Sequence, residues 1–306
     1  MVNEVVMRAH GLVKDFGGGG LVRRPPFRAV EDVSFEIPRG QTLALVGESG
    51  SGKSTTARMA AHLVEPTAGT IELEGEDVTR LRGPALARFR SRVQVVFQDP
   101  FSSLNPRHSV EQIVTAPLRY QRRRVPGGAR AFTGDLMERV GLDPDHSRRL
   151  PRQFSGGQAQ RIGIARALAV DPSVVICDEA VSALDVSVQA QVIELLGRLQ
   201  AEQGLSYLFI AHDLAVVRQI AQHVAVMSEG RIVEAGTRDQ VFDDPRQEYT
   251  RTLLAAVPRI PAEWDAARRA GAVDPGRGAP GAHEDPGTHP AGGAHTPAPA
   301  RAEETA

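Results

Sequence analysis

The chain has one cysteine, few aromatic residues and almost no net charge. The single cysteine, Cys177, excludes disulfide frameworks and zinc sites built from several cysteines, and it suits a reducing compartment. The 36 basic and 37 acidic side chains leave a formal net charge of −1, so no overall field attracts the chain to nucleic acid or anionic lipid. No apolar stretch is long enough to span a bilayer. If the protein acts at a membrane, we expect other chains to supply the spans.

A glycine-rich loop lies between a predicted strand and a predicted helix. Residues 42–46 are an apolar run, residues 54–64 favour a helix, and the loop between them has the pattern GxxxxGKS. Backbone N–H groups and the helix N-terminus make such a loop a phosphate site. We expect Lys53 to reach the β- and γ-phosphates of a triphosphate and the Ser54 hydroxyl to ligate Mg²⁺. The predicted nucleotide-binding residues of this stretch are Gly47, Glu48, Ser49, Gly50, Ser51, Gly52, Lys53, Ser54 and Thr55.

Two carboxylates end a second apolar run. Residues 173–177 predict a strand buried on both faces, with Cys177 as a small core residue. Asp178 and Glu179 then lie at the edge of a parallel sheet where ligands bind. We expect Asp178 to hold Mg²⁺ through its water shell and Glu179 to polarise the water that attacks the γ-phosphate. The alternative is a pair of surface acids that only closes the strand.

Two further polar residues follow predicted strands. Gln98 comes after residues 93–97, where its amide can touch Mg²⁺ or the attacking water; the alternative is an ordinary loop residue. His212 comes after the strand at 207–210, where it can donate to a γ-phosphate and sense whether that group is present; the alternative is a structural histidine.

The segment from about 101 to 168 predicts an inserted helical subdomain, because Pro, Arg and Gly interrupt short helical patterns there. Near its end, Ser155 and two glycines precede a helix predicted at 159–170. A serine and glycines at a helix start form a second anion-binding nest. One chain therefore carries two half-sites for phosphate.

Residues 5–11 and 29–38 alternate apolar and polar side chains, which predicts half-exposed antiparallel strands ahead of the phosphate loop. Phe16 and Phe27 flank the glycine- and proline-bearing insertion between these strands. Either ring can stack on a nucleotide base, a contact worth about 1–3 kcal/mol in nucleic-acid complexes. The alternative for both rings is core packing.

Taken together and in this order, the motifs resemble those of the ATP-binding cassette (ABC) ATPases. They are GESGSGKS at 47–54, Gln98, FSGGQ at 154–158, VVICDE at 174–179, SALD at 182–185 and His212. The resemblance implies an α/β fold, the P-loop NTPase of ABC type, with a mixed sheet core, an antiparallel β subdomain and an inserted helical subdomain. It also implies ATP and Mg²⁺ as ligands, with Ser54, Gln98 and Asp178 at the metal and Glu179, His212 and Gln98 as catalytic residues.

The same resemblance implies that two cassettes pair head to tail. Asp185 would communicate across this dimer, and Phe16 matches the base-stacking aromatic of the family better than Phe27 does. The signature residues of one cassette, which contact the ATP held by Lys53 of the other, would be Ser155, Gly156, Gly157 and Gln158.

A narrower resemblance is to the ATPases of oligopeptide and dipeptide permeases, especially the second member of each two-ATPase pair. It is carried by VVFQDPFSSLNPR at 95–107, FSGGQAQRIGIARAL at 154–168, SALDVSVQAQV at 182–192 and IAHDLAVV at 210–217. It implies an ATP-hydrolysing subunit of a peptide importer, peripheral at the cytoplasmic face of the cell membrane. The implied partners are a second ATPase subunit, identical or different, two membrane permeases and an extracytoplasmic solute-binding protein, and no nucleic acid. Residues 101–106 would contact a permease; the alternative is that they simply form a well-packed loop. The alternatives are an importer of nickel or another small solute, an ABC exporter, and a soluble ABC protein of translation or DNA repair.

The chain departs from these families in two places. Ala180 stands where proline normally follows the catalytic glutamate, so we expect a less rigid loop around Glu179. Gln247-Glu248-Tyr249 stands where the permease pattern reads His-Pro-Tyr. The predicted domains are a nucleotide-binding domain at 1–240, a peptide-importer-type extension at 241–262 and a disordered tail at 263–306, rich in Pro, Gly and Ala.

Overall fold

A computed structural model describes residues 4–17 and 27–256 of the chain. The tail expected from residue 263 lies outside these residues. None of the helices in the described residues is long and apolar enough to cross a membrane.

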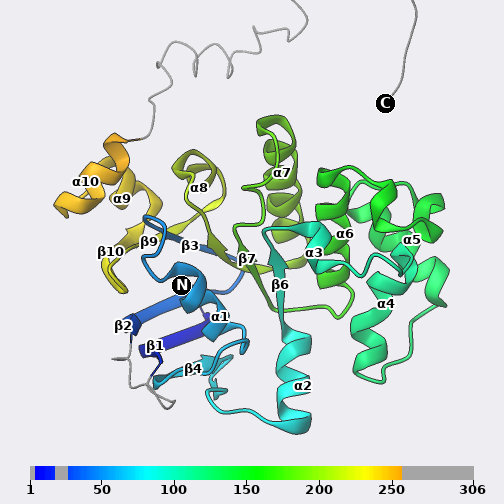
Figure 1. The fold of residues 1–306 in the computed structure, drawn as a ribbon, viewed down its shortest axis with the longest axis horizontal. Coiled ribbons are helices and arrows are strands. Elements are labelled where there is room, and N and C mark those ends of the chain that lie inside the picture. Colours follow the sequence, from blue (N-terminus) through cyan, green and yellow to red (C-terminus); the bar gives the residue numbers. More distant parts are fainter. Residues whose placement is uncertain (1–3, 18–26, 257–306) are drawn as a thin grey trace, which may run out of the picture. The chain divides into compact units, whose positions relative to one another are not determined.

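A six-stranded sheet forms the centre of the described structure (Figure 1). Its order is β10–β9–β3–β8–β7–β6, and every neighbouring pair is parallel except β9 and β10. The strands are β3 (Thr42–Val46), β6 (Val93–Phe97), β7 (Val174–Asp178), β8 (Ser206–Ile210), β9 (His223–Ser228) and β10 (Arg231–Thr237). Because the parallel strands run in one direction, their carboxyl ends share one edge.

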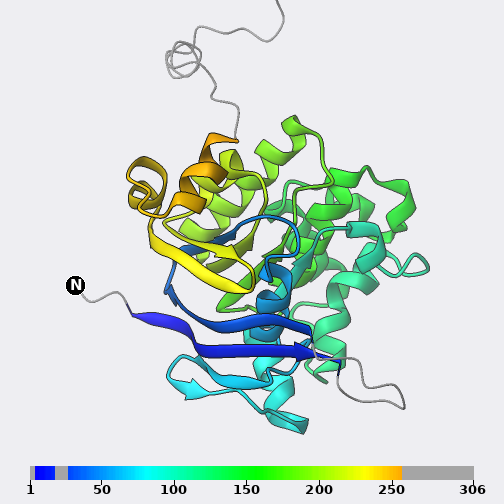
Figure 2. The ribbon, with the colours of Figure 1, turned by 60° about the vertical axis from the view of Figure 1, so that its left-hand side comes forward.

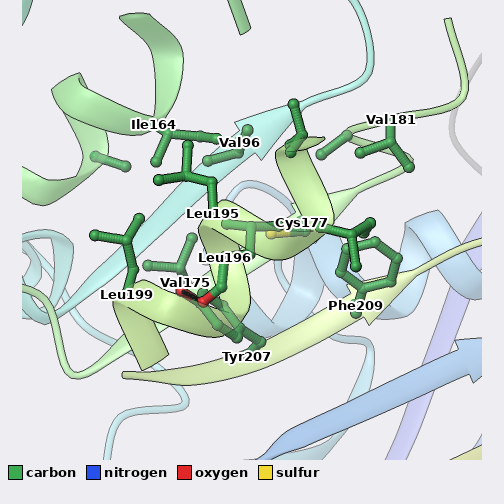
Figure 3. Close-up of a cluster of buried hydrophobic side chains, with 14 of the residues drawn as sticks. Val96, Ile164, Val175, Cys177, Val181, Leu195, Leu196, Leu199, Tyr207 and Phe209 are labelled. Atoms are coloured by element: carbon green, nitrogen blue, oxygen red, sulfur yellow. Dashed lines mark hydrogen bonds between the residues drawn. The ribbon is translucent and has the colours of Figure 1, made fainter. Parts of the chain in front are cut away.

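The parallel strands are mostly apolar because both faces of the sheet are covered. In β7, Val175 and Cys177 pack into one hydrophobic cluster, whereas Val174 and Ile176 pack into another. Figure 3 shows the first cluster, which β7 and β8 share with α6 and α7. Burial, followed by the charge of the neighbouring Asp178, raises the pKa of Cys177 to about 12, so this thiol is a core residue as predicted.

A second, antiparallel sheet of four strands packs over the other cluster. Its order is β2–β1–β4–β5, with bounds β1 (Val5–Phe16), β2 (Phe27–Pro38), β4 (Ala68–Leu73) and β5 (Glu76–Asp77). Figure 2 shows the long strands β1 and β2 side by side. Together with the mixed main sheet, this sheet confirms the predicted fold class.

The helices fall into three groups along the chain. The helix α1 (Lys53–Ala60) follows the glycine-rich loop, and α2 (Gly83–Arg92) leads into β6. Between β6 and β7 lie α3 (Pro100–Ser103), α4 (Val110–Tyr120), α5 (Ala129–Arg139), two 3₁₀ turns (Pro144–Arg148 and Pro151–Gln153) and α6 (Gly156–Leu168). These helices gather at the right of Figure 1 and form the expected helical insertion. The remaining helices are α7 (Val186–Gln203), α8 (Leu214–Ile220), α9 (Arg238–Asp243) and α10 (Glu248–Ala255).

Helix α1 ends at Ala60, four residues before the predicted end at 64. His62 adopts a left-handed conformation with φ 54°. The backbone N–H of His62 then donates to the carbonyl of Met59 and that of Leu63 donates to Arg58. This is the Schellman arrangement, usually made with glycine, so the residue types alone gave no stop signal.

The core-packing alternative for Phe16 and Phe27 is wrong. The two rings belong to residues paired across β1 and β2, and they are 41% and 66% exposed. β1 ends and β2 begins at these two residues, and neither ring belongs to the hydrophobic clusters formed by residues 4–17 and 27–256.

Candidate functional site

The glycine-rich loop leaves the carboxyl end of β3, and it is closely packed at two of its glycines while residues 48–50 between them are exposed. A side-chain carbon on Gly47 would lie 2.1 Å from the carbonyl oxygen of Met227, and one on Gly52 would lie 2.6 Å from that of Ala29. Both glycines also have positive φ, 144° and 100°. Glycine is therefore required at these positions for space and for backbone conformation. The loop is clamped between β9 and the start of β2.

Lys53 turns back into this loop. Its side chain is buried, and its Nζ donates to the carbonyls of Gly47 at 2.8 Å and Glu48 at 2.6 Å. Burial lowers the pKa of Lys53, and nearby carboxylates, with Glu179 the largest contributor, oppose that shift. The ammonium group is thus held by loop carbonyls beside the N-terminus of α1, where its charge and the helix N-terminus together favour an anion.

Ser54 and Asp178 bring two oxygen ligands together from different elements. The Ser54 hydroxyl on α1 donates to Oδ1 of Asp178, the last residue of β7, at 2.9 Å. Asp178 is buried, and its other oxygen lies 3.7 Å from Nε of Arg58. A hydroxyl and a carboxylate beside a phosphate loop form the oxygen set that Mg²⁺ prefers with nucleotide phosphates. The residues present fit a nucleotide-bound Mg²⁺.

Glu179 follows Asp178 in a left-handed backbone conformation, φ 51°. Its N–H donates to the carbonyl of Ile210 at 3.1 Å, and its carbonyl accepts from the N–H and the hydroxyl of Ser182 at 3.1 and 3.0 Å. These bonds hold the backbone of Glu179 even though Ala180, and not proline, follows it. Unusual backbone conformations held in this way cluster at functional sites.

The sheet register gathers the other predicted catalytic residues at the same edge. Phe97 of β6 pairs with Asp178, and Asp178 pairs with Ile210 of β8. Gln98 and His212 follow those strands, and both side chains are exposed. The strand order thus places the phosphate loop, Glu179 and these two side chains along one sheet edge.

The second nest belongs to the helical insertion. Ser155 caps α6, accepting from the N–H of Gln158 at 3.3 Å, while Gln158 accepts in turn from the N–H of Ser155 at 3.0 Å. Helix α6 contacts α3, α4, α5, α7 and β6, whereas α1 contacts β1, β2, β7 and β8. The two nests therefore rest on separate sets of elements.

The nest and the SALD turn are packed together. A side-chain carbon on Gly157 would lie 2.4 Å from Cγ1 of Val188 on α7. Asp185 caps α7 by accepting from the N–H of Val188 at 3.0 Å and from the hydroxyl of Ser187 at 2.7 Å. The hydrogen bond from Ser187 leads the effects that lower the pKa of Asp185.

Two side chains at the site were not predicted from the sequence. Arg58, beside Asp178, lies four residues after Ser54 and so on the same face of α1, a signal that helical spacing provides. The Tyr249 hydroxyl accepts from the N–H of Glu48 in the phosphate loop at 3.2 Å. Because the two residues are 201 positions apart in the sequence, local sequence patterns give no sign of that contact.

Three features define an ABC-type ATPase domain. They are a phosphate loop at the end of β3, two carboxylates at the end of β7 and a capped nest at the start of α6 in the helical insertion. Residues 30–182 match the family described as "ABC transporter", and residues 233–281 match "Oligopeptide/dipeptide transporter, C-terminal region". The chain belongs to the ABC transporter family, as its ATP-hydrolysing domain. The family and the ATPase activity predicted from the sequence are confirmed.

Curated relatives are similar over most of the chain. The "Probable peptide ABC transporter ATP-binding protein y4tS" of Sinorhizobium fredii is 48% identical over 260 residues, 84% of this chain and 74% of the relative. A "Putative peptide import ATP-binding protein" of Brucella abortus is 50% identical over 263 residues, 84% and 78% of the two chains. The "Glutathione import ATP-binding protein GsiA" of Pectobacterium atrosepticum is 49% identical over 258 residues, 83% of this chain but only 41% of the relative.

Solved structures share the fold. A dimeric post-hydrolysis state of the ATP-binding cassette MJ0796 bound to ADP and Pi has a TM-score of 0.67 at 26% identity and covers 76% of this chain and 98% of its own. The cbiO1 cassette of Clostridium perfringens has a TM-score of 0.70 at 25% identity, covering 86% and 99%.

Proposed function

We propose that the chain is the ATP-hydrolysing subunit of an ABC importer of peptides. The observation that carries the proposal is the junction of an ABC cassette with an oligopeptide/dipeptide transporter C-terminal region in one chain. The names of the relatives support the same cargo class, since glutathione is itself a tripeptide.

In this proposal the phosphate loop, Lys53 and Thr55 hold the triphosphate, and Phe16 stacks on the base. Ser54 and Gln98 would ligate Mg²⁺ directly and Asp178 through water; the ion neutralises charge that develops on the phosphates. The half-exposed position of Phe16 at the end of β1 leaves its ring accessible to a base.

Glu179 takes the proton of the water that attacks the γ-phosphate. This role is supported by the position of Glu179 directly after the last residue of β7, at the sheet edge shared with the phosphate loop, and by its held backbone at φ 51°. His212, at the same edge, donates to the γ-phosphate and so distinguishes ATP from ADP. Both roles agree with the exposure of His212 and the half-buried position of Glu179, which leave the two side chains accessible to the nucleotide.

Two cassettes pair head to tail, each closing the ATP site of the other with Ser155, Gly156, Gly157 and Gln158. This arrangement is supported by the packing of α1 and α6 on different elements. In a head-to-tail pair, the phosphate loop and the Ser155 nest of one chain then bind different nucleotides. Two membrane permeases hold the pair at the cytoplasmic face of the membrane, and an extracytoplasmic solute-binding protein delivers the cargo.

The segment 101–106 is the proposed contact with a permease. Its first residue, Phe101, is 44% exposed, and Asp99 holds the turn by accepting from the N–H of Phe101 at 2.9 Å. This apolar ring follows Gln98 by three positions, so movement of a permease here reaches the nucleotide site over a short stretch of chain.

The test is uptake of a labelled tripeptide and of labelled Ni²⁺ by the native cells, comparing the intact chain with Lys53→Ala and with the exposed control Arg124→Ala. The proposal predicts that Lys53→Ala abolishes tripeptide uptake alone and that the control retains it. Loss of Ni²⁺ uptake alone would assign the chain to metal import. If neither uptake changes, an exporter or another cargo replaces the proposal.

A further inference from the structure

The C-terminal helix α10 reaches the phosphate loop through one side chain. The Tyr249 hydroxyl accepts a hydrogen bond from the backbone N–H of Glu48 at 3.2 Å. We propose that Tyr249 is a positioning residue of the nucleotide site, whose hydroxyl fixes the peptide unit between Gly47 and Glu48. The inference concerns nucleotide binding and stands whatever the transported cargo is.

That peptide unit is held at both of its polar ends. Its carbonyl, on Gly47, accepts from Lys53 Nζ at 2.8 Å, while its N–H, on Glu48, donates to Tyr249. The carbonyl of Met227 closes off the side where a Gly47 side chain would project. The unit therefore cannot rotate without losing a hydrogen bond or colliding with β9.

The tether from Tyr249 matters most when nucleotide binds. In the proposed bound state Lys53 extends to the phosphates, and the Gly47 carbonyl gives up its ammonium partner. The hydrogen bond to Tyr249 then remains on the same peptide unit. It keeps the start of the loop in a shape that accepts phosphate, so that less order has to be created on binding.

Tyr249 is itself firmly placed. Its ring is half-buried and packs on the main hydrophobic cluster, as do Phe242 and Leu253. The chain just before α10 is tied to β10, because the Glu234 carboxylate accepts from the backbone N–H groups of Arg246 at 2.7 Å and Gln247 at 3.1 Å.

These contacts connect α10 to the phosphate loop at one end and to β10 at the other. The sheet runs from β10 through β9 to β3, the strand that leads into the phosphate loop, and α10 returns from β10 to that loop. Residues 233–281, which match the oligopeptide/dipeptide transporter C-terminal region, include both Glu234 and Tyr249. This region therefore contributes to the shape of the ATP site and is not only attached to the cassette.

The first variant is Tyr249→Phe, which keeps the packed ring and removes only the hydroxyl. We expect MgADP to bind the full chain roughly threefold to tenfold more weakly, the usual effect of one lost hydrogen bond. The melting temperature without nucleotide should stay close to that of the wild type. Calorimetric titration with MgADP and thermal unfolding measure the two quantities.

The matched control is Tyr120→Phe, which removes the hydroxyl of a 72% exposed tyrosine at the end of α4. The control should bind MgADP like the wild type. Unchanged MgADP affinity in folded Tyr249→Phe would overturn the proposal. A merely structural role for the tyrosine would lower the melting temperature and leave the affinity of the folded protein intact.

A second variant tests the route from β10. Glu234→Ala removes the carboxylate that ties the start of α10, and we expect it to weaken MgADP binding in the wild type. In the Tyr249→Phe background the same change should have little further effect, because both act on one contact. Equal weakening in both backgrounds would show that Glu234 does not act through Tyr249.

Discussion

At the scale of single residues, Glu179 is the proposed general base, and its backbone is held although alanine, not proline, follows it. Its left-handed backbone is fixed by Ile210 on the neighbouring strand and by Ser182 in the following turn. Ala180 is 1% exposed, so the next residue is anchored by burial. Hydrogen bonds and packing thus hold this loop where alanine replaces proline, and its lower rigidity stays a prediction.

Glu179→Gln should abolish phosphate release while sparing nucleotide binding. The amide keeps the shape of the side chain but cannot accept a proton at neutral pH, so we expect at least a 100-fold loss, about the contribution of a general base. Phosphate release and MgATP titration on the same preparation measure the two effects.

The matched control for this prediction is Glu76→Gln, an exposed residue of β5 in the antiparallel sheet. It removes one negative charge away from the carboxyl edge of the six-stranded sheet, and the turnover of this variant should equal that of the wild type. Near-normal hydrolysis by Glu179→Gln would show that another group accepts the proton.

At the scale of secondary structure elements, the starts of α6 and α7 behave as one unit. Gly157 leaves just enough space for Val188, whose N–H is capped by Asp185. The contact between Gly157 and Val188 therefore fixes the position of the nest at Ser155 relative to the SALD turn. A displacement of either helix start moves the other.

Gly157→Ala should separate these helix starts. The new methyl group would meet Cγ1 of Val188 at 2.4 Å, so one helix must shift, at a cost of about 1–3 kcal/mol in stability. We expect phosphate release to fall roughly tenfold to hundredfold, because small misplacements at a reacting centre are costly. Chemical denaturation and steady-state hydrolysis report the two effects.

The same helix supplies the control. A side-chain carbon on Gly163 would meet no atom within 4 Å outside its own helix backbone, so Gly163→Ala should leave hydrolysis intact and stabilise α6 by about 0.5–1 kcal/mol. Removing the colliding methyl with Val188→Ala should restore activity to the Gly157→Ala chain. Failure of that rescue would mean that the glycine acts on the nucleotide directly and not through α7.

Elements with strong local patterns were predictable, and contacts between distant elements were not. The apolar run at 173–177 correctly predicted a strand buried on both faces, because a parallel sheet covered on both sides requires it. The end of α1 was missed, since His62 takes a conformation that its residue type disfavours. The exposure of Phe16 and Phe27 depends on how far the antiparallel sheet extends, which local patterns do not give. The contact of Tyr249 depends on the tertiary fold, which brings α10 to the phosphate loop.

At the scale of the whole molecule, one chain carries the two half-sites for phosphate that we propose. The phosphate loop is supported by the two sheets, and the nest at Ser155 is supported by the helical insertion and α7. With head-to-tail pairing, each composite site takes the loop of one chain and the nest of the other. A chain with one damaged half-site therefore spoils only the site to which that half contributes. Two inactive chains with different defects can then complement each other.

Mixing Lys53→Ala with Ser155→Arg should restore hydrolysis that neither variant shows alone. A mixed dimer has one site with both defects and one site with neither, so an equal mixture should reach roughly a quarter of the wild-type rate if pairing is random. The arginine is accommodated because Ser155 is exposed, although the lost cap costs about 1 kcal/mol of stability. Each variant is assayed alone and in mixture at the same total concentration.

Activity no greater than the sum of the separate variants would show that two copies of this chain do not build these composite sites. The pairing partner would then have to be a different ATPase subunit.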